Sequence, residues 1–389
     1  MAYLTIEERD RRLANVRTLM DTKGLDIVLV YYDEFNIGNG WYLTGWCPQF
    51  ESGAVLVPRT GQPMLLGGPE SEPFARLDSA ISETRNFTVF MVPNEEYPNA
   101  TITDFPALFS ELNQMLGAVR RVGLVGGGRM PADCYRQIVE GFRGSELVDI
   151  TPDYVALRYY KSSWEMAQIR VAFGLADKCY DAMKACIAPG VSEIEVAAAG
   201  EYAARSQGAS GFGFSPIVGS GRRSSAVVPT ATSKVMQAGE TVMIGIAPKV
   251  RGYAGVVGDF LPVSGAYTPP QQEALKHLKE VLHLTKEQLV PGKVGREIDA
   301  PGRDYFVKHG FWRYLVCPFA HTIGLHEAEE PFFGPHSEDI LQPGMAVCVD
   351  VSFFGHPELY GARIETGYEI TELGAVPFSL MLDKLLTGV

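Results

Sequence analysis

The sequence predicts an α/β protein of two domains: a small N-terminal domain with a mixed sheet, residues 1–157, and a larger C-terminal domain, residues 158–389. Three observations support this prediction. Strand-like runs alternate with helical patterns in the first part, a long capped helix opens the second part, and the second part contains an internal repeat. The chain has 389 residues, of which 46% are hydrophobic, so it is long enough to bury a core in each domain.

The N-terminal domain begins with a helix. Thr5 and Glu8 have the spacing of a capping box, and Gly24 ends the helix after Lys23. A buried strand, DIVLVY at 26–31, comes next. Further strands are predicted at 54–57, 64–66, 88–92 and 121–125, and a helix at 102–116. This alternation predicts a mixed sheet.

The C-terminal domain also opens with a helix. Ser162 and Glu165 form a second capping box, and apolar residues recur at helical spacing until Pro189 and Gly190 end the pattern. Another helix is predicted from Ser192. The domain boundary therefore lies between the last strand-like run and this capped helix.

The internal repeat follows from two segments that begin at Pro189 and Pro291. PGVSEIEVAAAGEYAARSQG aligns with PGKVGREIDAPGRDYFVKHG, and the Pro-Gly start and the final glycine match at an offset of 102 residues. The alternative is that Pro and Gly end helices of similar length in both places. Two copies would give a sheet of pseudo-twofold symmetry with a cleft between its halves.

Charge and composition restrict the partners. The net charge is -12, with 34 basic and 46 acidic residues, and no cluster of Lys and Arg suggests nucleic acid or an anionic membrane. A small-molecule substrate is expected instead. No apolar run reaches the roughly 18 residues of a membrane span, and the charged N-terminus lacks a signal-peptide core, so a cytoplasmic location is predicted.

The six cysteines show no CxxC spacing, which argues against a zinc knuckle or a disulfide framework. Most are expected to be buried thiols. Cys317 and Cys348 flank the acid-base residues described next and remain as minor candidates for a nucleophile.

Three acid-base residues stand in fixed order near the C-terminus: His321 in AHTIGL, Asp350 in MAVCVDVS and Glu365 in YGARIETG. Buried carboxylates on apolar strands need partners, so these residues predict a site. The alternatives are a hydrogen-bonded core histidine and structural ion pairs of the two acids with Arg363 or a neighbour.

Residues 158–373 resemble the pita-bread superfamily of creatinase, prolidase, aminopeptidase P and methionine aminopeptidase. The resemblance rests on YKSSWEMAQIRVA, APGVSEIEV, FSPIVGSGRRSSA, GETVMIGIAPKVRGY, FAHTIGLHEAEEP, LQPGMAVCVDVSF and ARIETGYEIT. FNIGNGWYLTGW further resembles the N-terminal domain of creatinase and prolidase. The resemblance covers nearly the whole chain and implies a pita-bread fold for the C-terminal domain.

The metallopeptidases of this superfamily carry the metal ligands Asp, Asp, His, Glu, Glu in that order. Here the two Asp positions fall on Gly245 and Val256, and the others on His321, Asp350 and Glu365. Two further family histidines fall on Val228 and Ala328. The resemblance therefore argues against a dinuclear centre, although His321, Asp350 and Glu365 could hold a single divalent metal. A β-bulge could add Asp259 as a fourth ligand.

Creatinase is the precedent for C–N hydrolysis without metal in this superfamily, and the chain is closest in character to that branch. The resemblance implies that His321 carries the proton, oriented by Asp350 or Glu365. His326, in the loop after His321, could have a second acid-base role and replace the family histidine that is lost.

Substrate contacts are expected from six residues. Glu51 occupies the position of an arginine that binds the substrate carboxylate in creatinase, which disfavours a creatine-like substrate. Arg222 and Arg223 could bind an anionic group, or they could be solvated loop residues. The full set of expected substrate contacts is Glu51, Arg222, Arg223, Tyr253, Glu327 and Arg363.

The predicted function is hydrolysis of an amide, amidine or guanidine C–N bond in a small nitrogenous compound, without a metal cofactor. Three alternatives remain open: a lyase or hydrolase with one metal, a non-catalytic binding protein, and a prolidase-type peptidase. The resemblance also implies a homodimer in which each N-terminal domain contributes to the neighbour's pocket.

Overall fold

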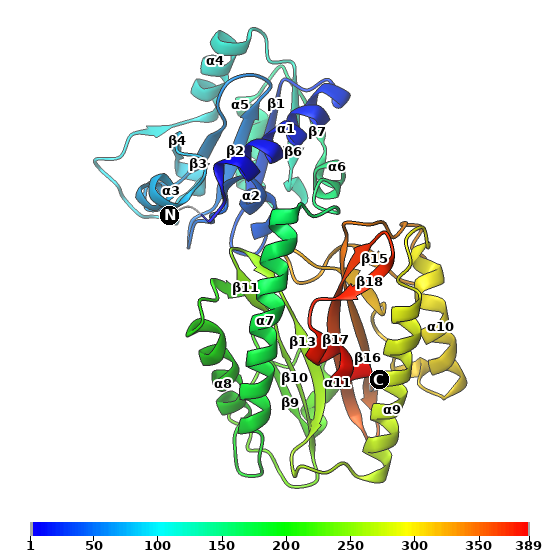
Figure 1. Cartoon of the computed structure of the whole chain (residues 1–389). Helices are drawn as coiled ribbons and strands as arrows, with labels where there is room; N and C mark the ends of the chain where they lie inside the picture. The colour runs from blue at the N-terminus through cyan, green and yellow to red at the C-terminus, as the bar shows by residue number, and fades with distance from the viewer. Residues whose placement is uncertain (1–2, 388–389) are drawn as a thin grey trace. The chain divides into compact units, whose positions relative to one another are not determined.

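The computed structural model describes residues 3–387, and the chain divides into two compact units, Met1–Arg158 and Tyr159–Val389 (Figure 1). The first unit contains a mixed sheet of seven strands in the order β5-β4-β3-β2-β1-β6-β7. The pair β1 and β2 is antiparallel, whereas β1 and β6 are parallel. The strands are β1 (Ile27–Tyr32), β2 (Gly53–Pro58), β3 (Met64–Gly67), β4 (Thr84–Phe87), β5 (Ile102–Thr103), β6 (Arg121–Val125) and β7 (Glu146–Asp149).

The first helix of this unit follows its sequence signals. The Thr5 side chain accepts a hydrogen bond from the Glu8 N–H, and Gly24 ends the helix with a left-handed φ of 63°. The helices of the unit are α1 (Ile6–Lys23), α2 (Ile37–Thr44), α3 (Glu72–Asp78), α4 (Phe105–Leu116), α5 (Ala132–Gly141) and α6 (Thr151–Ala156). The sequence did not predict α2, α3, α5 or α6.

The strand predicted at 88–92 is wrong, because Thr88–Phe90 forms a 3₁₀ helix. The turn carries Phe90 into an aromatic cluster, where its ring lies 5.9 Å from Phe87 and 6.2 Å from Phe105. Packing of these rings therefore overrides the local preference for an extended backbone.

The second unit is built on a sheet whose path is β15-β14-β16-β17-β13-β10-β9. Its two halves have the same order: β9, β10 and β13 in one, and β14, β16 and β17 in the other. The strands are β9 (Ile217–Ser220), β10 (Thr241–Ile246), β13 (Val257–Pro262), β14 (Ala320–Thr322), β15 (Glu329–Phe333), β16 (Ala346–His356) and β17 (Tyr360–Thr371), with β18 (Gly374–Pro377) paired to β17. A small sheet joins β8 (Gly211–Phe212), β11 (Pro248–Val250) and β12 (Tyr253–Ala254).

Helices pack on each half of this sheet (Figure 1). Buried residues of α7 (Ser163–Cys186) and α8 (Glu193–Arg205) share a core with β9, β10 and β13. Buried residues of α9 (Pro269–Glu287) and α10 (Gly295–Lys308) share another core with β14, β16 and β17. The last described helix, α11 (Leu380–Thr387), contributes Leu382 to one core and Leu386 to the other.

The predicted repeat is confirmed by matching local structure. Gly190 and Gly292 both have a positive φ, as do Gly208 and Gly310. Isolated bridges join Ser192 to Val235 and Val294 to Ile340, at equivalent places before α8 and α10. The predicted fold class, an α/β protein with a C-terminal pseudo-twofold domain, is therefore correct.

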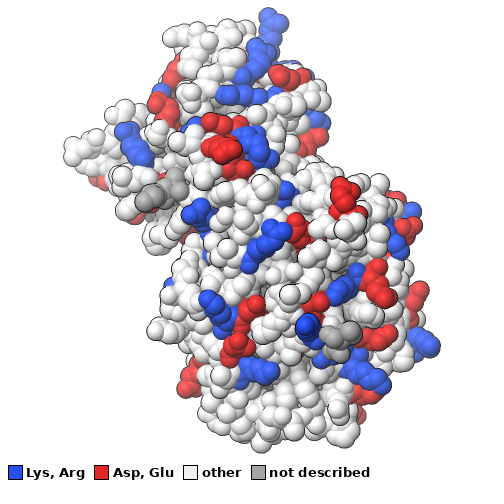
Figure 2. Space-filling model, in the orientation of Figure 1, with Lys and Arg blue, Asp and Glu red and all other residues white. Residues whose placement is uncertain are grey.

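Surface charge is mixed on the face drawn in Figure 2, where basic and acidic side chains are interspersed. Among the described residues, no helix combines the length and the apolar character that crossing a bilayer requires.

Candidate active site

Three neighbouring strands of the second unit bring His321, Asp350 and Glu365 together. His321 lies opposite Cys348 in the pairing of β14 with β16, and Asp350 lies opposite Glu365 in the pairing of β16 with β17. Opposed residues in a sheet point to the same face, and alternate residues of β16 do too, so the three side chains share one face. One ligand atom from each lies within 4.8 Å of the others, and their exposed fractions are 7%, 7% and 2%.

The orientation of His321 is fixed by its backbone neighbour. Its Nδ1 lies 3.0 Å from the Thr322 carbonyl oxygen, which assigns the proton to Nδ1 and directs Nε2 toward the acids. Nε2 lies 3.7 Å from Glu365 Oε1 and 3.8 Å from Glu327 Oε1. Burial acts to lower the pKa of His321, but the nearby carboxylates outweigh it and raise the pKa to about 9.

The two acids of the cluster have pKa values above their ordinary values, because both are buried. Burial, and then the charge of Glu327, raise the pKa of Glu365 to about 7. Burial raises the pKa of Asp350 to about 6 against the opposing charge of Arg363. Strongly shifted groups in one buried cluster are typical of functional sites.

Arg363 forms a buried ion pair with Asp350. Its Nε donates to Asp350 Oδ1 at 3.0 Å, and the arginine is 6% exposed. Burial opposes the charge on Arg363, but Asp350 and Glu365 raise its pKa above the ordinary value. The predicted ion pair of Asp350 with Arg363 is therefore present, and it lies within the acid cluster.

Among the residues that the structure describes, the strands of the first half of the sheet direct no acid toward this cluster. Glu365 lies opposite Gly258, Gly258 lies opposite Gly245, and Gly245 lies opposite Ile217. A Cβ atom at position 245 would lie 3.3 Å from Cβ and Cδ1 of Ile217, and one at position 258 would lie 3.1 Å from Cγ and Cδ of Arg363. Ile217 and the Arg363 stem therefore occupy the space next to both glycines.

This geometry decides how many cations the residues fit. Gly245 and Val256 offer no side-chain donor, and Val256 is fully buried. A second cation would therefore lack ligands on the first half of the sheet. One divalent cation fits, because an imidazole and two carboxylates converge and the Oε1 atom of Glu365 is buried without a hydrogen-bond partner.

Asp259 does not join this site, so the expectation of an inward bulge is wrong. Strands β10 and β13 pair without interruption from Thr241 opposite Pro262 to Ile246 opposite Val257. Asp259 therefore points away from the face that Gly258 occupies. Its carboxylate accepts hydrogen bonds from Tyr180 Oη at 2.8 Å and from the Phe260 N–H at 2.7 Å.

Two further residues lie beside the cluster. Glu327, in the loop between β14 and β15, has a side chain that is 13% exposed and lies 3.8 Å from His321. Cys348 precedes Asp350 by two residues on β16, and one ligand atom each from Glu327, Cys348 and Glu365 lie within 4.8 Å of one another. Burial raises the pKa of Cys348 and of Cys317, so both favour the unreactive thiol form.

His326 and Tyr253 have structural contacts. The His326 N–H donates to Glu329 Oε1 at 3.1 Å, and its carbonyl accepts from the Gly324 N–H at 2.9 Å, so its backbone stabilises the turn that carries Glu327. Glu329 itself begins β15, so the loop that contains His326 ends there. Tyr253 Oη donates to Glu165 Oε1 at 2.6 Å and anchors α7.

Glu51 lies in the first unit and binds backbone. Its carboxylate accepts hydrogen bonds from the N–H groups of Glu70, at 3.3 Å, and Ser71, at 2.9 Å, and the residue is 2% exposed. These contacts order the turn before α3. They differ from the substrate contact that the sequence suggested for Glu51.

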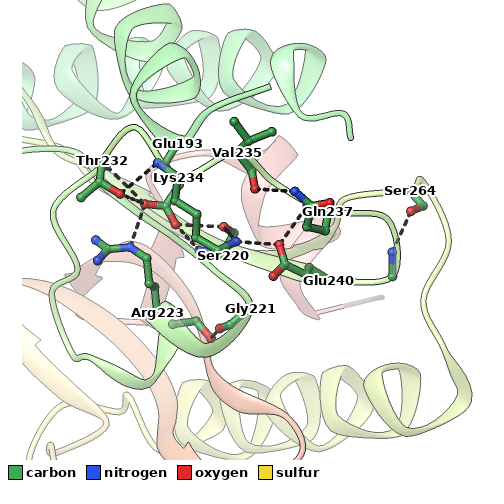
Figure 3. Close-up of polar contacts among 12 residues, drawn as sticks. Glu193, Ser220, Gly221, Arg223, Thr232, Lys234, Val235, Gln237, Glu240 and Ser264 are labelled. Atoms are coloured by element: carbon green, nitrogen blue, oxygen red, sulfur yellow. Dashed lines mark hydrogen bonds and ion pairs between the residues drawn. The ribbon is translucent and has the colours of Figure 1, made fainter. Parts of the chain in front are cut away.

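Arg223 belongs to a buried network around Glu193 (Figure 3). Its Nε donates to Glu193 Oε2 at 2.9 Å and its Nη2 to the Thr230 carbonyl at 2.6 Å. Glu193 is fully buried and also accepts from the backbone and hydroxyl groups of Ser220 and Thr232. Arg223 therefore fixes the 3₁₀ turn Gly221–Ser225, on which Arg222 is exposed.

Comparison with known proteins identifies the domains. A model of metallopeptidase family M24 matches residues 167–372, and one of the creatinase/prolidase N-terminal domain matches residues 12–160. The chain is 33% identical over 230 residues to the uncharacterized peptidase YqhT of Bacillus subtilis, covering 59% of this chain and 65% of that protein. It is 24% identical over 366 residues to a Xaa-Pro dipeptidase of Pyrococcus horikoshii, covering 94% and 96%.

Solved structures show the same fold. The prolidase from Pyrococcus horikoshii superposes with a TM-score of 0.80 at 22% identity, over 95% of this chain and 97% of that one. The X-Pro aminopeptidase from Thermotoga maritima gives a TM-score of 0.82 at 20% identity, over 94% and 97%.

These findings correct the predicted function. Metal-free hydrolysis of a non-peptide C–N bond, as in a creatinase-like branch, is contradicted by relatives that are named as dipeptidases and prolidases. The prolidase-type alternative agrees better with them. The M24 model covers more than half of the residues, and the chain belongs to metallopeptidase family M24.

Proposed function

We propose that the chain is a prolidase-type peptidase that hydrolyses small peptides with a single divalent cation, held by His321, Asp350 and Glu365. One observation carries this proposal: ligand atoms of these three residues lie within 4.8 Å of one another on the buried face of three adjacent strands. The family supports the choice of a peptide bond.

The count of one cation follows from the two halves of the site. The second half supplies one imidazole and two carboxylates, a donor set that suits a divalent ion such as Mn²⁺. The first half supplies glycines beside Ile217 and Arg363. When bound, the cation would polarise the scissile carbonyl and activate a water molecule.

The residues of the chain position the ligands and shape their surroundings. Thr322 orients His321 through Nδ1. Arg363 neutralises Asp350 and keeps its carboxylate in place. Burial of the cluster excludes bulk water and strengthens the electrostatic interaction of these groups with the polar bond that is to be cleaved.

The test is cleavage of Xaa-Pro dipeptides by protein treated with a chelator and then supplied with Mn²⁺. We expect no cleavage without metal and recovery of activity when about one Mn²⁺ per chain is bound. Substitution His321→Ala should abolish the recovered activity, because it removes the only imidazole of the three-residue cluster. The exposed substitution Glu330→Gln is the matched control.

Cleavage that persists at full rate in chelated, metal-free protein would contradict the proposal. So would the absence of cleavage with every divalent cation tested across a panel of dipeptides. Retention of activity by His321→Ala would remove the residue from the site.

We further propose that the protein is a cytoplasmic homodimer acting on a small-molecule substrate. The six cysteines are free, as is usual for a reducing compartment. Twofold dimers are the commonest assembly of soluble oligomers. Light scattering should give the mass of two chains, and the mass of one chain would contradict the dimer.

A further inference from the structure

Glu327 reaches the acid cluster from outside the main sheet. It lies in the loop that joins β14 to β15, whereas His321, Asp350 and Glu365 lie on strands. Its side chain is 87% buried by area, being 13% exposed, and its Oε1 atom has no hydrogen-bond partner. The nearby imidazole nitrogen, His321 Nε2, lies 3.8 Å away, beyond hydrogen-bond distance, and a buried carboxylate oxygen that makes no hydrogen bond is costly unless a ligand pairs with it.

The packing of Glu327 places it against the first half of the sheet. A Cβ atom at Gly213 would lie 2.7 Å from Cβ of Glu327 and 3.1 Å from Cβ of Ala247. Ala247 directly follows β10 and is two residues beyond Gly245, where the first family ligand is missing. A Cβ atom at Gly213 would contact both Glu327 and Ala247, so Glu327 lies near the end of β10 that carries Gly245.

A second buried oxygen faces the same region. Glu365 Oε1 also lacks a hydrogen-bond partner, in a side chain that is 3% exposed. Ligand atoms of Glu327 and Glu365 lie within 4.8 Å of each other, and both carboxylates approach His321 Nε2. The cluster thus sets three carboxylates against one guanidinium, and that guanidinium is bonded to Asp350.

We propose that Glu327 is a fourth ligand of the cation, so that one divalent ion is bound by His321, Glu327, Asp350 and Glu365. This inference rests on the proposed single-cation function and adds a donor that the family pattern does not contain. Glu327 supplies from a loop the carboxylate that Gly245 and Val256 cannot supply.

Cys348 lies within the same group but is a poor ligand for a hard cation. It is fully buried, and burial favours its neutral thiol over the thiolate that binds metals. Three carboxylates and one imidazole favour Mn²⁺ or a similar ion over thiophilic metals.

The test measures Mn²⁺ binding to the metal-free full chain by calorimetry, without any peptide substrate. Glu327→Gln should weaken binding roughly 10- to 100-fold or more, since even loss of an outer-shell partner costs that much. Glu330→Gln removes an exposed charge three residues away and should leave the affinity unchanged. Gly213→Ala should also weaken binding, because the added methyl group displaces Glu327 without changing any charge.

Thermal unfolding of the metal-free proteins separates binding from folding. Glu327→Gln should be at least as stable as the parent, because it relieves repulsion between buried carboxylates. Glu365→Gln serves as the reference for loss of a strand ligand.

The outcomes distinguish this inference from the proposed function. Equal Mn²⁺ affinity of the parent and Glu327→Gln, with loss only in Glu365→Gln, would overturn the inference and leave the single-cation peptidase intact. Binding that depends on Glu327, without cleavage of any Xaa-Pro dipeptide, would support the inference and contradict the peptidase. Failure of the parent to bind Mn²⁺ would overturn both.

Discussion

Asp259 is a buried acid whose surroundings differ from those of the active-site acids. Tyr180 and the Phe260 N–H donate to it, and Lys184, Lys279 and Tyr267 face it at longer range. Burial is the largest influence and raises its pKa from 3.8 to about 6. The folded state therefore binds a proton that the unfolded state releases between these two pH values.

Because the pKa of Asp259 is higher in the folded state, its ionisation lowers the stability of the fold as pH rises. Between pH 4 and pH 6 the free energy of unfolding should fall by up to about 3 kcal/mol because of Asp259, and it should be constant above that range. Asp259→Asn should remove this contribution. Urea unfolding from pH 4 to pH 8 measures it, with the exposed Asp304→Asn as control. A pH profile unchanged by Asp259→Asn would contradict the prediction.

The sequence named three residues that the structure brings together, but it did not predict their whole surroundings. His321, Asp350 and Glu365 could be named because charged residues stand out in apolar strands, and the structure brings them together. The contact of Glu327 with His321 could not be predicted, because it depends on the path of a loop. The roles of Ile217 and Gly258 were missed because they follow from strand register, which short apolar segments do not specify.

Strand β10 carries Gly245 at the position of the first metal ligand of the family, and restoring an acid there tests whether this strand can still bind metal. Gly245→Asp places a carboxylate where the family has one, but Ile217 fills the adjacent space. We expect destabilisation on the order of 3 kcal/mol, because the buried charge has no partner. Gly245→Ala measures the steric part alone. Urea unfolding of both variants, with and without Mn²⁺, measures their free energies of unfolding relative to the parent.

The number of bound cations should remain one in Gly245→Asp. A variant as stable as the parent that binds a second Mn²⁺ would show that the first half of the sheet can still hold a metal.

Helices with a capping box at their start were predicted correctly, whereas a helix rich in glycine was missed. Ser162 and Ser192 both form complete capping boxes, and α7 and α8 begin directly after them. Helix α2 was missed because IGNGWYLT contains two glycines, which disfavour a helix in isolation. Its buried face, which includes Tyr42 and Leu43, shows that tertiary packing stabilises it.

Each unit of the molecule has its own hydrophobic core. The core of the first unit draws on residues from Ile27 to Phe142, and the cores of the second on residues from Leu175 to Leu386. All four proposed ligands belong to the second unit. We therefore expect residues 159–389, produced alone, to fold cooperatively and to bind Mn²⁺ with the affinity of the full chain.

Circular dichroism and calorimetry on this fragment make the measurement. A folded fragment that binds no Mn²⁺ would show that the cation site needs residues outside the second unit.

The fold of the whole molecule could be predicted because the repeat and the order of seven motifs span most of the chain. The reaction could not. Loss of the ligands at Gly245 and Val256 suggested metal-free chemistry on a non-peptide bond. Missing ligands limit how many cations the protein can bind, but they do not identify its substrate. Which bond is cleaved depends on the arrangement of the remaining groups, and relatives provide better guidance to it.

Above all, we predict that one cation is bound by three strand residues, His321, Asp350 and Glu365, together with Glu327 from the loop between β14 and β15. Anomalous diffraction from crystals soaked in Mn²⁺ tests it most directly. We predict one peak per chain, coordinated by His321, Glu327, Asp350 and Glu365. Two bridged peaks, or a single peak that Glu327 does not contact, would contradict it.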